Sequence, residues 1–409
     1  MSSSRRLLDI CPKVVPAGAV SELVIRATDD FHFQPTANYE VQCFPREAIG
    51  SDHAEPGIAP ADVHVSGDGK LHIRFAFLGE QEYAIFVYAV AEEKRTLLAE
   101  LSVYSLEDDL FALRPFKGDF HMHSNRSDGK DSPAHVAAAC RRIGLDFMAL
   151  TDHRQYQPSL DAIAAFADMP IDLKMYPGEE VHPPENTVHI VNFGGRFSIN
   201  ALFDDDTYRR EVSDIEQSLS ENFTPKDRYR YASCVWCYEK IRQAGGLSLF
   251  CHPYWIINER YCVPESLIEA LLRNKPFDAF EIIGGFPRAN TERNALQIAR
   301  YHEERAKGRT YPIVGVSDAH GCERDELFGW YYTIVWAPSA DLSEIINGVK
   351  SFHSVAIEAV PDAPVHIHGP FRLVKYAYFL LREVFPAHDA LCREEGELMM
   401  AHLTGDATA

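Results

Sequence analysis

The sequence predicts an α/β protein in which a β/α barrel follows an all-β domain. Apolar residues recur with period two up to about Arg114, which is typical of strands that bury one face. Beyond Phe116, predicted strands alternate with predicted helices, the order that builds a parallel sheet or barrel. With 409 residues the chain exceeds what one compact core usually supports, so we expect two domains.

The first domain, residues 1–114, is expected to be an immunoglobulin-like β-sandwich. Turn sequences such as Gly67-Asp68-Gly69 separate short strands, as in antiparallel sandwiches. Catalytic residue types do not cluster in this part of the sequence, so we expect a role in structural support or dimerisation. The period-two segments are 22–27, 39–44, 63–65, 71–77, 83–90 and 97–104.

The second domain, residues 115–360, is expected to be the barrel. Ser132 and Pro133 are typical of a helix N-cap and first turn, and Gly144 ends that helix before a strand at 146–150. Further strands are expected at 173–176, 188–193, 247–250, 279–283 and 311–316, with helices at 233–244, 264–273 and 290–307.

Two segments fall outside this repeat. The polar stretch at about 197–231 is an insertion that forms either a lid over the site or a solvated surface excursion. Residues 361–409 form a C-terminal extension whose aromatic-rich helix, 371–385, is expected to pack on the barrel or on a partner subunit. Its apolar surface, with that of the sandwich, makes a homodimer the expected assembly. The last residues, 404–409, are expected to fray.

Composition narrows the class of function. The formal net charge of −20 argues against nucleic acid as a partner, because phosphate backbones require a cationic surface. No stretch approaches the roughly 18 to 20 apolar residues of a membrane helix. The first residues, 1–6, lack the apolar region of a secretory signal, and the nine cysteines show no disulfide framework, so we expect a cytoplasmic protein.

Imidazole and carboxylate residues follow the ends of several predicted strands. His153, Glu180, His252 and Asp318 each come directly after a different strand, which places them at the catalytic rim of a β/α barrel. Neutral imidazole and carboxylate are the ligands that hold Zn, Mn or Fe in open hydrolytic sites. The sequence therefore predicts a multinuclear metal site and favours hydrolysis.

Strand geometry explains the spacing of two further pairs. Residues i and i+2 of a strand face the same side, so His121 and His123 can both reach the barrel mouth. Asp318 and His320 repeat this spacing on a late strand, and Asp128 lies on a tight turn close behind the first pair. Two strands and one loop thus supply five candidate ligands.

These motifs together resemble the PHP superfamily (polymerase and histidinol phosphatase) over about residues 116–358. The resemblance implies a distorted (β/α)7 barrel that holds two or three divalent ions, with the proposed bridging carboxylate at Glu180 rather than Glu179. The matching motifs are Phe120-His-Met-His-Ser124, Ser127-Asp-Gly129, Leu150-Thr-Asp-His153, Pro177-Gly-Glu-Glu180, His189, His252-Pro253 and Gly315-Val-Ser-Asp-Ala-His320.

The resemblance also implies how the ligands are shared, and it places Asp152 behind them, orienting a neighbouring imidazole. The third site is the one at which family members vary, since some carry His at the position of Asp128. The first ion would be held by His121, His123, Glu180 and Asp318, the second by Glu180, His189 and His252, and the third by Asp128, His153 and His320.

The preceding sandwich and the Gly178-Glu-Glu-Val-His-Pro-Pro184 motif are similar to the carbaryl-hydrolase-type subgroup of this superfamily. The superfamily implies a phosphoesterase that acts on a small-molecule ester through a metal-bridging hydroxide, and the subgroup implies a carboxylic-ester or carbamate hydrolase instead. In either case Asp318 or His320 would relay a proton to the leaving group. A metal-binding module without turnover is a third alternative.

The residues near the motifs fit both substrate classes. Arg126, Arg154 and Arg288 would bind a phosphate group if they lie at the rim. Tyr254 and Trp255, which follow His252-Pro253, would instead line an apolar pocket for an aromatic leaving group. The alternatives for these residues are surface positions for the arginines and core packing for the aromatic pair.

Overall fold

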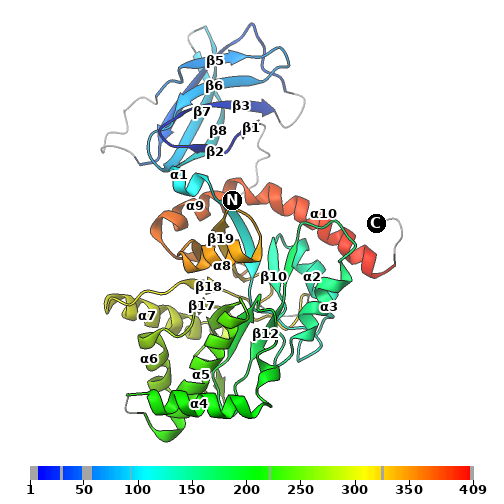
Figure 1. Cartoon of the computed structure of the whole chain (residues 1–409). Helices are drawn as coiled ribbons and strands as arrows, with labels where there is room; N and C mark the ends of the chain where they lie inside the picture. Colours follow the sequence, from blue (N-terminus) through cyan, green and yellow to red (C-terminus); the bar gives the residue numbers. More distant parts are fainter. Residues whose placement is uncertain are drawn as a thin grey trace. The chain divides into compact units, whose positions relative to one another are not determined.

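The computed structural model describes residues 8–27, 31–47, 58–92, 94–220, 223–323 and 327–405. The chain divides into two compact units (Figure 1). The first unit contains residues 1–114 and 378–386, and the second contains residues 115–377 and 387–409. The N-terminal residues 1–6, on which the expectation about a secretory signal rests, and the terminal 406–409 lie outside the described part of the chain.

The first unit is built from two sheets with one core between them. The strand orders are β1-β3-β6-β5 and β2-β8-β7-β4. Leu23 and Ile73 from one sheet and Val41, Ile85 and Val103 from the other are fully buried in the same cluster, which explains the period-two pattern of the sequence. The strands are β1 (Leu8–Cys11), β2 (Val14–Pro16), β3 (Val20–Ala27), β4 (Asn38–Pro45), β5 (Asp62–Val65), β6 (Leu71–Ala76), β7 (Gln81–Ala91) and β8 (Lys94–Leu106), followed by helix α1 (Asp108–Phe111).

The second unit contains two mixed sheets, in contrast to the parallel arrangement that the repeated β/α units predict. Their orders are β11-β10-β9-β19-β20-β21 and β12-β13-β14-β17-β18, and β13 runs antiparallel to both of its neighbours. The strands are β9 (Arg114–Asp119), β10 (Phe147–Ala149), β11 (Lys174–Tyr176), β12 (Gly178–Val181), β13 (Ile190–Phe193), β14 (Leu247–Phe250), β17 (Ala279–Ile283), β18 (Ile313–Gly315), β19 (Tyr331–Ala337), β20 (Ser354–Glu358) and β21 (His366–His368), with a separate hairpin of β15 (Ile256–Ile257) and β16 (Arg260–Tyr261).

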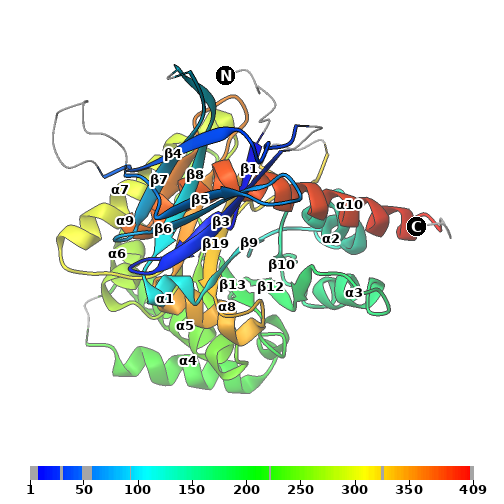
Figure 2. The ribbon, with the colours of Figure 1, turned by 90° about the horizontal axis from the view of Figure 1, so that it is seen from above.

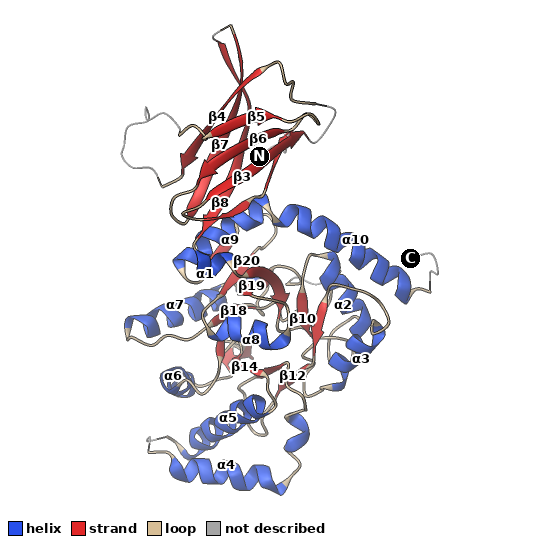
Figure 3. Ribbon diagram, turned by 45° about the horizontal axis from the view of Figure 1, so that its top comes forward, coloured by secondary structure: helices blue, strands red, loops and turns tan. Residues whose placement is uncertain are grey.

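Helices pack around these sheets (Figure 3). Ser132 caps α2 as the sequence predicts, since its side chain accepts a hydrogen bond from the His135 N–H. Helix α5 begins at Pro225 rather than Ser233, because Thr224 provides a cap that shortens the expected insertion. The helices are α2 (Pro133–Arg142), α3 (Gln157–Ala165), η1 (Asn200–Leu202), α4 (Asp206–Ser218), α5 (Pro225–Gln243), α6 (Glu265–Asn274), η2 (Arg288–Asn290), α7 (Glu292–Ala306), α8 (Leu342–Lys350), α9 (Phe371–Glu383) and α10 (Phe385–Leu403).

The strands that carry the site are buried on both faces. Every residue of β14 and of β17 is buried, which explains why these segments read as continuous apolar runs rather than as alternating ones. Glu281 interrupts the second run with a carboxylate that is 0% exposed. Such a group requires partners, and the site supplies them. Among the described residues, no helix is both long and apolar enough to span a membrane.

Helix α10 extends beyond the predicted C-terminal helix and lies beside α2, as two views show (Figure 1 and Figure 2). Arg141 of α2 forms an ion pair with Glu395 at 2.6 Å, and His388 contacts Asp146 at 2.8 Å. Gly396 allows the close approach, because a Cβ atom built there would lie 2.4 Å from the backbone nitrogen of Arg142. The contact therefore requires a residue without a side chain.

The variant Gly396→Ala is expected to lower the free energy of unfolding by about 1–3 kcal/mol, because overpacking forces α10 away from α2. This loss exceeds the gain in helix propensity on replacing glycine. Chemical denaturation measures the change. Gly67→Ala is the matched control, since a Cβ atom there meets nothing within 4 Å. Equal stabilities of the two variants would contradict the proposed close contact.

Candidate metal centre

Two short segments of the candidate centre, 121–123 and 318–320, run side by side. His121, Met122 and His123 follow β9, and Met122 forms a parallel bridge with Ala319. The His123 N–H donates to the Ala319 carbonyl at 2.9 Å, and the Asp318 N–H donates to the His121 carbonyl at 2.9 Å. This register brings the two pairs of alternating polar residues together, while Met122 is buried on the opposite side.

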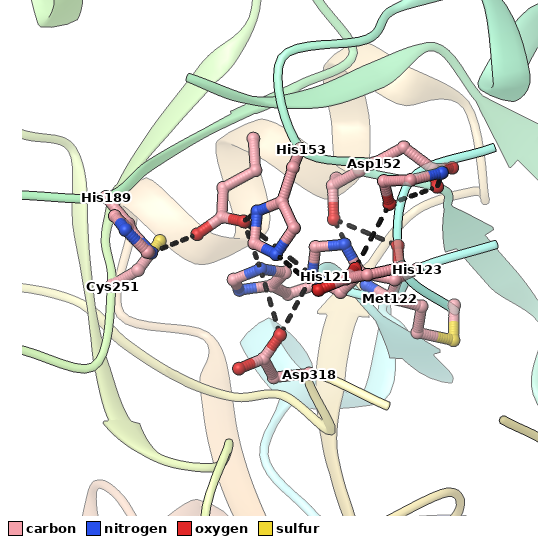
Figure 4. A network of polar contacts seen from close by, with 12 residues as sticks. His121, Met122, His123, Asp152, His153, His189, Cys251 and Asp318 are labelled. Atoms are coloured by element: carbon pink, nitrogen blue, oxygen red, sulfur yellow. Dashed lines mark hydrogen bonds and ion pairs between the residues drawn. The ribbon is translucent and has the colours of Figure 1, made fainter. Parts of the chain in front are cut away.

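The carboxylate of Glu180 lies among several imidazoles. Its Oε1 is 2.7 Å from His189 Nδ1 and 3.5 Å from His252 Nε2. Its Oε2 is 3.7 Å from the Nε2 atoms of both His121 and His123, and it also contacts His153 Nδ1. Figure 4 shows His121, His153 and His189 turned toward a common centre.

The mixed sheet explains how these residues meet. Glu180 lies within β12 rather than after the strand at 174–176, and His252 follows β14 closely. Because β13 runs antiparallel to both strands, its first residue, Ile190, lies at the same edge as the ends of β12 and β14. His189, directly before β13, therefore joins the same rim although it precedes its strand.

Asp318 provides the second carboxylate of the buried cluster around Glu180, which we call the inner group. Its Oδ1 is 2.9 Å from His123 Nε2 and 3.3 Å from His121 Nε2, and its Oδ2 is 3.8 Å from His252 Nε2. Burial by itself raises the pKa of Asp318, but the nearby His121 and His123 hold it well below the usual range. Asp318 is therefore ionised, the state that a metal ligand requires.

A more exposed group adjoins the inner one. Asp128 lies on the turn after the first histidine pair, with Oδ2 3.4 Å from His153 Nε2 and Oδ1 3.3 Å from His320 Nε2. The His320 and His123 rings stack at 4.3 Å. The sets whose ligand atoms lie close enough to hold an ion include His123, Asp128, His153 and His320; His121, His123 and Glu180; and His121, His252 and Asp318.

The buried polar atoms of the inner group fit a cation. His121 Nε2, His189 Nδ1 and both oxygens of Glu180 are buried without a hydrogen bond of acceptable geometry. Unsatisfied buried polar atoms cost free energy, and ions bound among them would satisfy them. The donor set of imidazole and carboxylate matches Zn, Mn or Fe.

The pKa shifts of the buried groups also favour a bound cation. Burial alone raises the pKa of Glu180, but His189 and His121 hold it well below its usual value, so the group is a carboxylate. Burial lowers the pKa of His189 to about 4, against the opposing charge of Glu180. For His252 burial is opposed by Glu180 and Asp318, and its pKa is raised to about 9. A divalent ion would replace the proton that these carboxylates attract.

Glu281 is a residue of the site that the sequence analysis missed. One carboxylate oxygen lies 2.7 Å from His121 Nδ1, and the other accepts a hydrogen bond from the His252 backbone N–H at 2.8 Å. The pairing of β17 with β18 shifts register between Glu281 and Ile283, as is common beside functional sites. The signal in the sequence was a charged residue inside an apolar strand.

Three other acidic residues support the backbone around the centre. Asp152 accepts from the backbone and hydroxyl groups of Ser124 and Ser127, so it fixes the loop before Asp128 and does not orient an imidazole as expected. Glu179 does not face the candidate ligands. Its carboxylate accepts hydrogen bonds from Ser198 Oγ at 2.7 Å and from Asn200 Nδ2 at 2.8 Å. Asp119 accepts from the Ser317 N–H, and burial raises its pKa to about 7.

A pocket of about 220 Å³, which we call the metal pocket, opens directly onto the candidate ligands His153, His189, His252, Asp318 and His320. Trp255 and Phe286 form its apolar wall, and the Trp255 ring lies 4.7 Å from the His189 ring. Tyr254 does not line this pocket; it is buried, with its hydroxyl 3.4 Å from Arg300 Nε.

The three candidate phosphate-binding arginines take different positions. Arg154 lines a second pocket of about 470 Å³, which we call the side pocket and which also includes His182 and Asn200. Arg126 pairs with Asp161 at 3.8 Å. The Arg288 guanidinium lies 5.4 Å from the centre of the Trp330 ring and donates to the Pro361 carbonyl. Of the three, Arg154 is the one that lines either pocket.

Comparison with known proteins gives a local sequence match. No known protein-family model matches the chain. A stretch of 91 residues is 40% identical to the DNA polymerase/3'-5' exonuclease PolX of Bacillus subtilis. The match covers 22% of this chain and 16% of that protein, so most of the polymerase has no counterpart in the match.

Comparison with solved structures gives partial matches. A two-domain protein from Bacteroides vulgatus, described as containing a predicted PHP-like metal-dependent phosphoesterase, is 18% identical with a TM-score of 0.41, over 60% of this chain and 65% of that one. An amidohydrolase from Chromobacterium violaceum, with bound sulfate and no metal, is 20% identical with a TM-score of 0.32, over 52% of this chain and 89% of that one.

The variant Glu281→Gln is expected to weaken binding of Mn²⁺ or Zn²⁺ by roughly 10- to 100-fold, the usual effect of changing a partner of a metal-binding histidine. The neutral amide lacks the negative charge that makes His121 Nε2 a strong electron-pair donor to a metal ion. Competition with a chelator measures the affinity. Glu358→Gln is the control, because Glu358 contacts His366, an exposed histidine outside the centre, at 3.2 Å. Unchanged affinity in Glu281→Gln would remove this residue from the centre.

Proposed function

We propose that the chain is a metal-dependent hydrolase that cleaves a small-molecule phosphate ester. The observation that carries the proposal is the close grouping of the candidate ligands around a centre in which several buried polar atoms form no hydrogen bond of acceptable geometry. A purely structural cluster would pair these atoms with one another or with backbone groups. The phosphoesterase description of the Bacteroides vulgatus protein agrees with this substrate class.

Two or three divalent ions, Zn, Mn or Fe, would be shared among the ligands. One ion would use His121, His123, Glu180 and Asp318, a second Glu180, His189 and His252, and a third Asp128, His153 and His320. When bound, such ions polarise the ester and lower the pKa of water. The ligand groups already lie in overlapping sets, and Glu180 Oε1 faces both His189 and His252.

The remaining residues of the pockets would bind the substrate and handle its proton. Arg154, which follows His153 and lines the side pocket, would bind a phosphate oxygen. His320 donates through Nδ1 to the Asp318 carbonyl at 2.8 Å, which leaves its Nε2 facing the more exposed group. We assign proton transfer to the leaving group to the Asp318 carboxylate, or to His320 Nε2 when the third ion is absent and this nitrogen is free; both residues line the metal pocket.

A second candidate is hydrolysis of a carboxylic ester or carbamate. The apolar wall of Trp255 and Phe286 beside the ligands favours it, because an aromatic leaving group would stack there. The ligand chemistry is the same for both candidates, and the two differ in which part of the substrate contributes the binding energy. A metal-binding protein without turnover is the remaining alternative.

Initial rates on p-nitrophenyl phosphate mono- and diesters, carboxylic esters and aryl carbamates will distinguish these functions. The Mn- or Zn-loaded protein is expected to hydrolyse a phosphate ester. His252→Ala should lower kcat/KM by roughly a hundredfold or more, since losing a ligand exceeds the loss of an outer partner. His366→Ala, at an exposed histidine, should leave the rate unchanged. Turnover of the ester or carbamate alone would establish the second candidate, and no turnover with bound metal would favour the third.

Two pocket variants test which wall binds the substrate. Arg154→Ala is expected to raise KM for a phosphate ester by roughly tenfold, because a charged hydrogen bond to phosphate is lost. Trp255→Ala should change KM for aryl substrates more than for alkyl ones. Arg126→Ala serves as the control, since Arg126 pairs with Asp161 away from both pockets. An unchanged KM in Arg154→Ala would remove that residue from the phosphate site.

A further inference from the structure

We propose that His182 is a metal ligand of the centre, in addition to the residues predicted from sequence. The proposal rests on the proposed function, because it requires that the centre binds divalent ions. His182 follows β12 in the segment Gly178-Glu-Glu-Val-His182. In an extended segment residues two apart face the same side, so Glu180 and His182 repeat the spacing of His121 and His123.

The backbone around His182 is held in place. Its N–H donates to Asn200 Oδ1 at 3.2 Å, and Asn200 Nδ2 donates in turn to the Glu180 carbonyl at 3.1 Å and to Glu179 Oε2 at 2.8 Å. Asn200 lies in η1, within the segment expected as an insertion. That segment therefore fixes the strand end that carries both Glu180 and His182.

The imidazole of His182 faces the same carboxylate oxygen as His153. His182 Nε2 is 3.4 Å from Glu180 Oε2 and 3.0 Å from His153 Nδ1. Ligand atoms around a tetrahedral ion with bonds near 2.0–2.1 Å are separated by about 3.3 Å. The contact between His153 Nδ1 and Glu180 Oε2 is shorter than this, and entry of an ion would open it.

The ring of His182 is oriented by a neighbour as well. It stacks on the His189 ring, with 4.1 Å between centroids and 25° between planes. His189 faces Glu180 Oε1, while His182 faces Oε2. The stacked pair thus presents one nitrogen to each oxygen of the central carboxylate, the arrangement expected when two ions share it.

The alternative to a bound ion is a simple hydrogen bond between His182 and His153, and it explains less of this geometry. One proton can join the two facing nitrogens, but it leaves the Glu180 oxygen beside them without a donor, and this oxygen forms no hydrogen bond of acceptable geometry. An ion among the three atoms satisfies all of them. It binds His153 through Nδ1, so the third ion would keep Asp128 and His320 as its ligands. Because His182 also lines the side pocket with Arg154, an ion held there would be reached by a substrate from that pocket.

The test compares metal binding by the full chain and its His182→Asn variant, without reference to activity. After equilibration with Mn²⁺ or Zn²⁺, elemental analysis gives ions per chain, and chelator competition gives their affinities. The variant is expected to retain one ion fewer, or to bind one ion roughly tenfold or more weakly. His366→Asn is the matched control, because it changes a histidine with an acidic neighbour outside the centre. Circular dichroism confirms that each variant is folded.

Imidazole ¹⁵N NMR on the wild-type protein gives a second measurement that does not depend on a variant folding. Titration with Zn²⁺ should shift the Nε2 resonance of His182 as it shifts those of the other ligands. Unchanged stoichiometry and affinity in His182→Asn, or an unshifted resonance at full occupancy, would overturn the assignment of His182 alone. A wild-type protein that binds no divalent ion would overturn the proposed function as well.

Discussion

The carboxylate of Glu180 sets the constraint on which the second unit depends. It is completely buried, ionised and without a hydrogen bond of acceptable geometry, and six imidazoles face its two oxygens. An isolated buried charge is too costly for a protein to retain. The surrounding rings, and the ions that they are suited to hold, are what make this residue tolerable inside the fold.

The packing around the centre serves the same requirement. Glu281 is enclosed within a buried strand, yet it reaches both the His121 ring and the His252 backbone. Asp119 and Asp152 hold the backbone on either side through main-chain N–H groups. These carboxylates hold the candidate ligands in position without an ion, which would lower the reorganisation that ion binding requires.

The two pockets are lined by different kinds of side chain. The metal pocket offers an apolar wall, Trp255 and Phe286, whereas the side pocket offers Arg154 and His182. The segment 197–231, expected as either a lid or a surface excursion, contributes Ser198, Asn200 and Asp204 to the side pocket. It therefore shapes a cavity next to the centre, and its hydrogen bonds to Glu179 tie it to the strand that carries Glu180.

Local sequence determined the residue types of the centre and much of the secondary structure. Strand spacing identified the His121 and Asp318 pairs, and strands 247–250 and 279–283 have the bounds that their apolar runs predict. The sequence could not show that β13 is antiparallel, because strand direction depends on partners distant in the chain. It therefore could not show that His189 reaches the centre from the start of its strand rather than from the end. For the same reason Glu281, 160 residues from His121, and His182, beside His153, were missed. Spacing along one strand decides which side chains share a face, while only the folded sheets decide which faces meet.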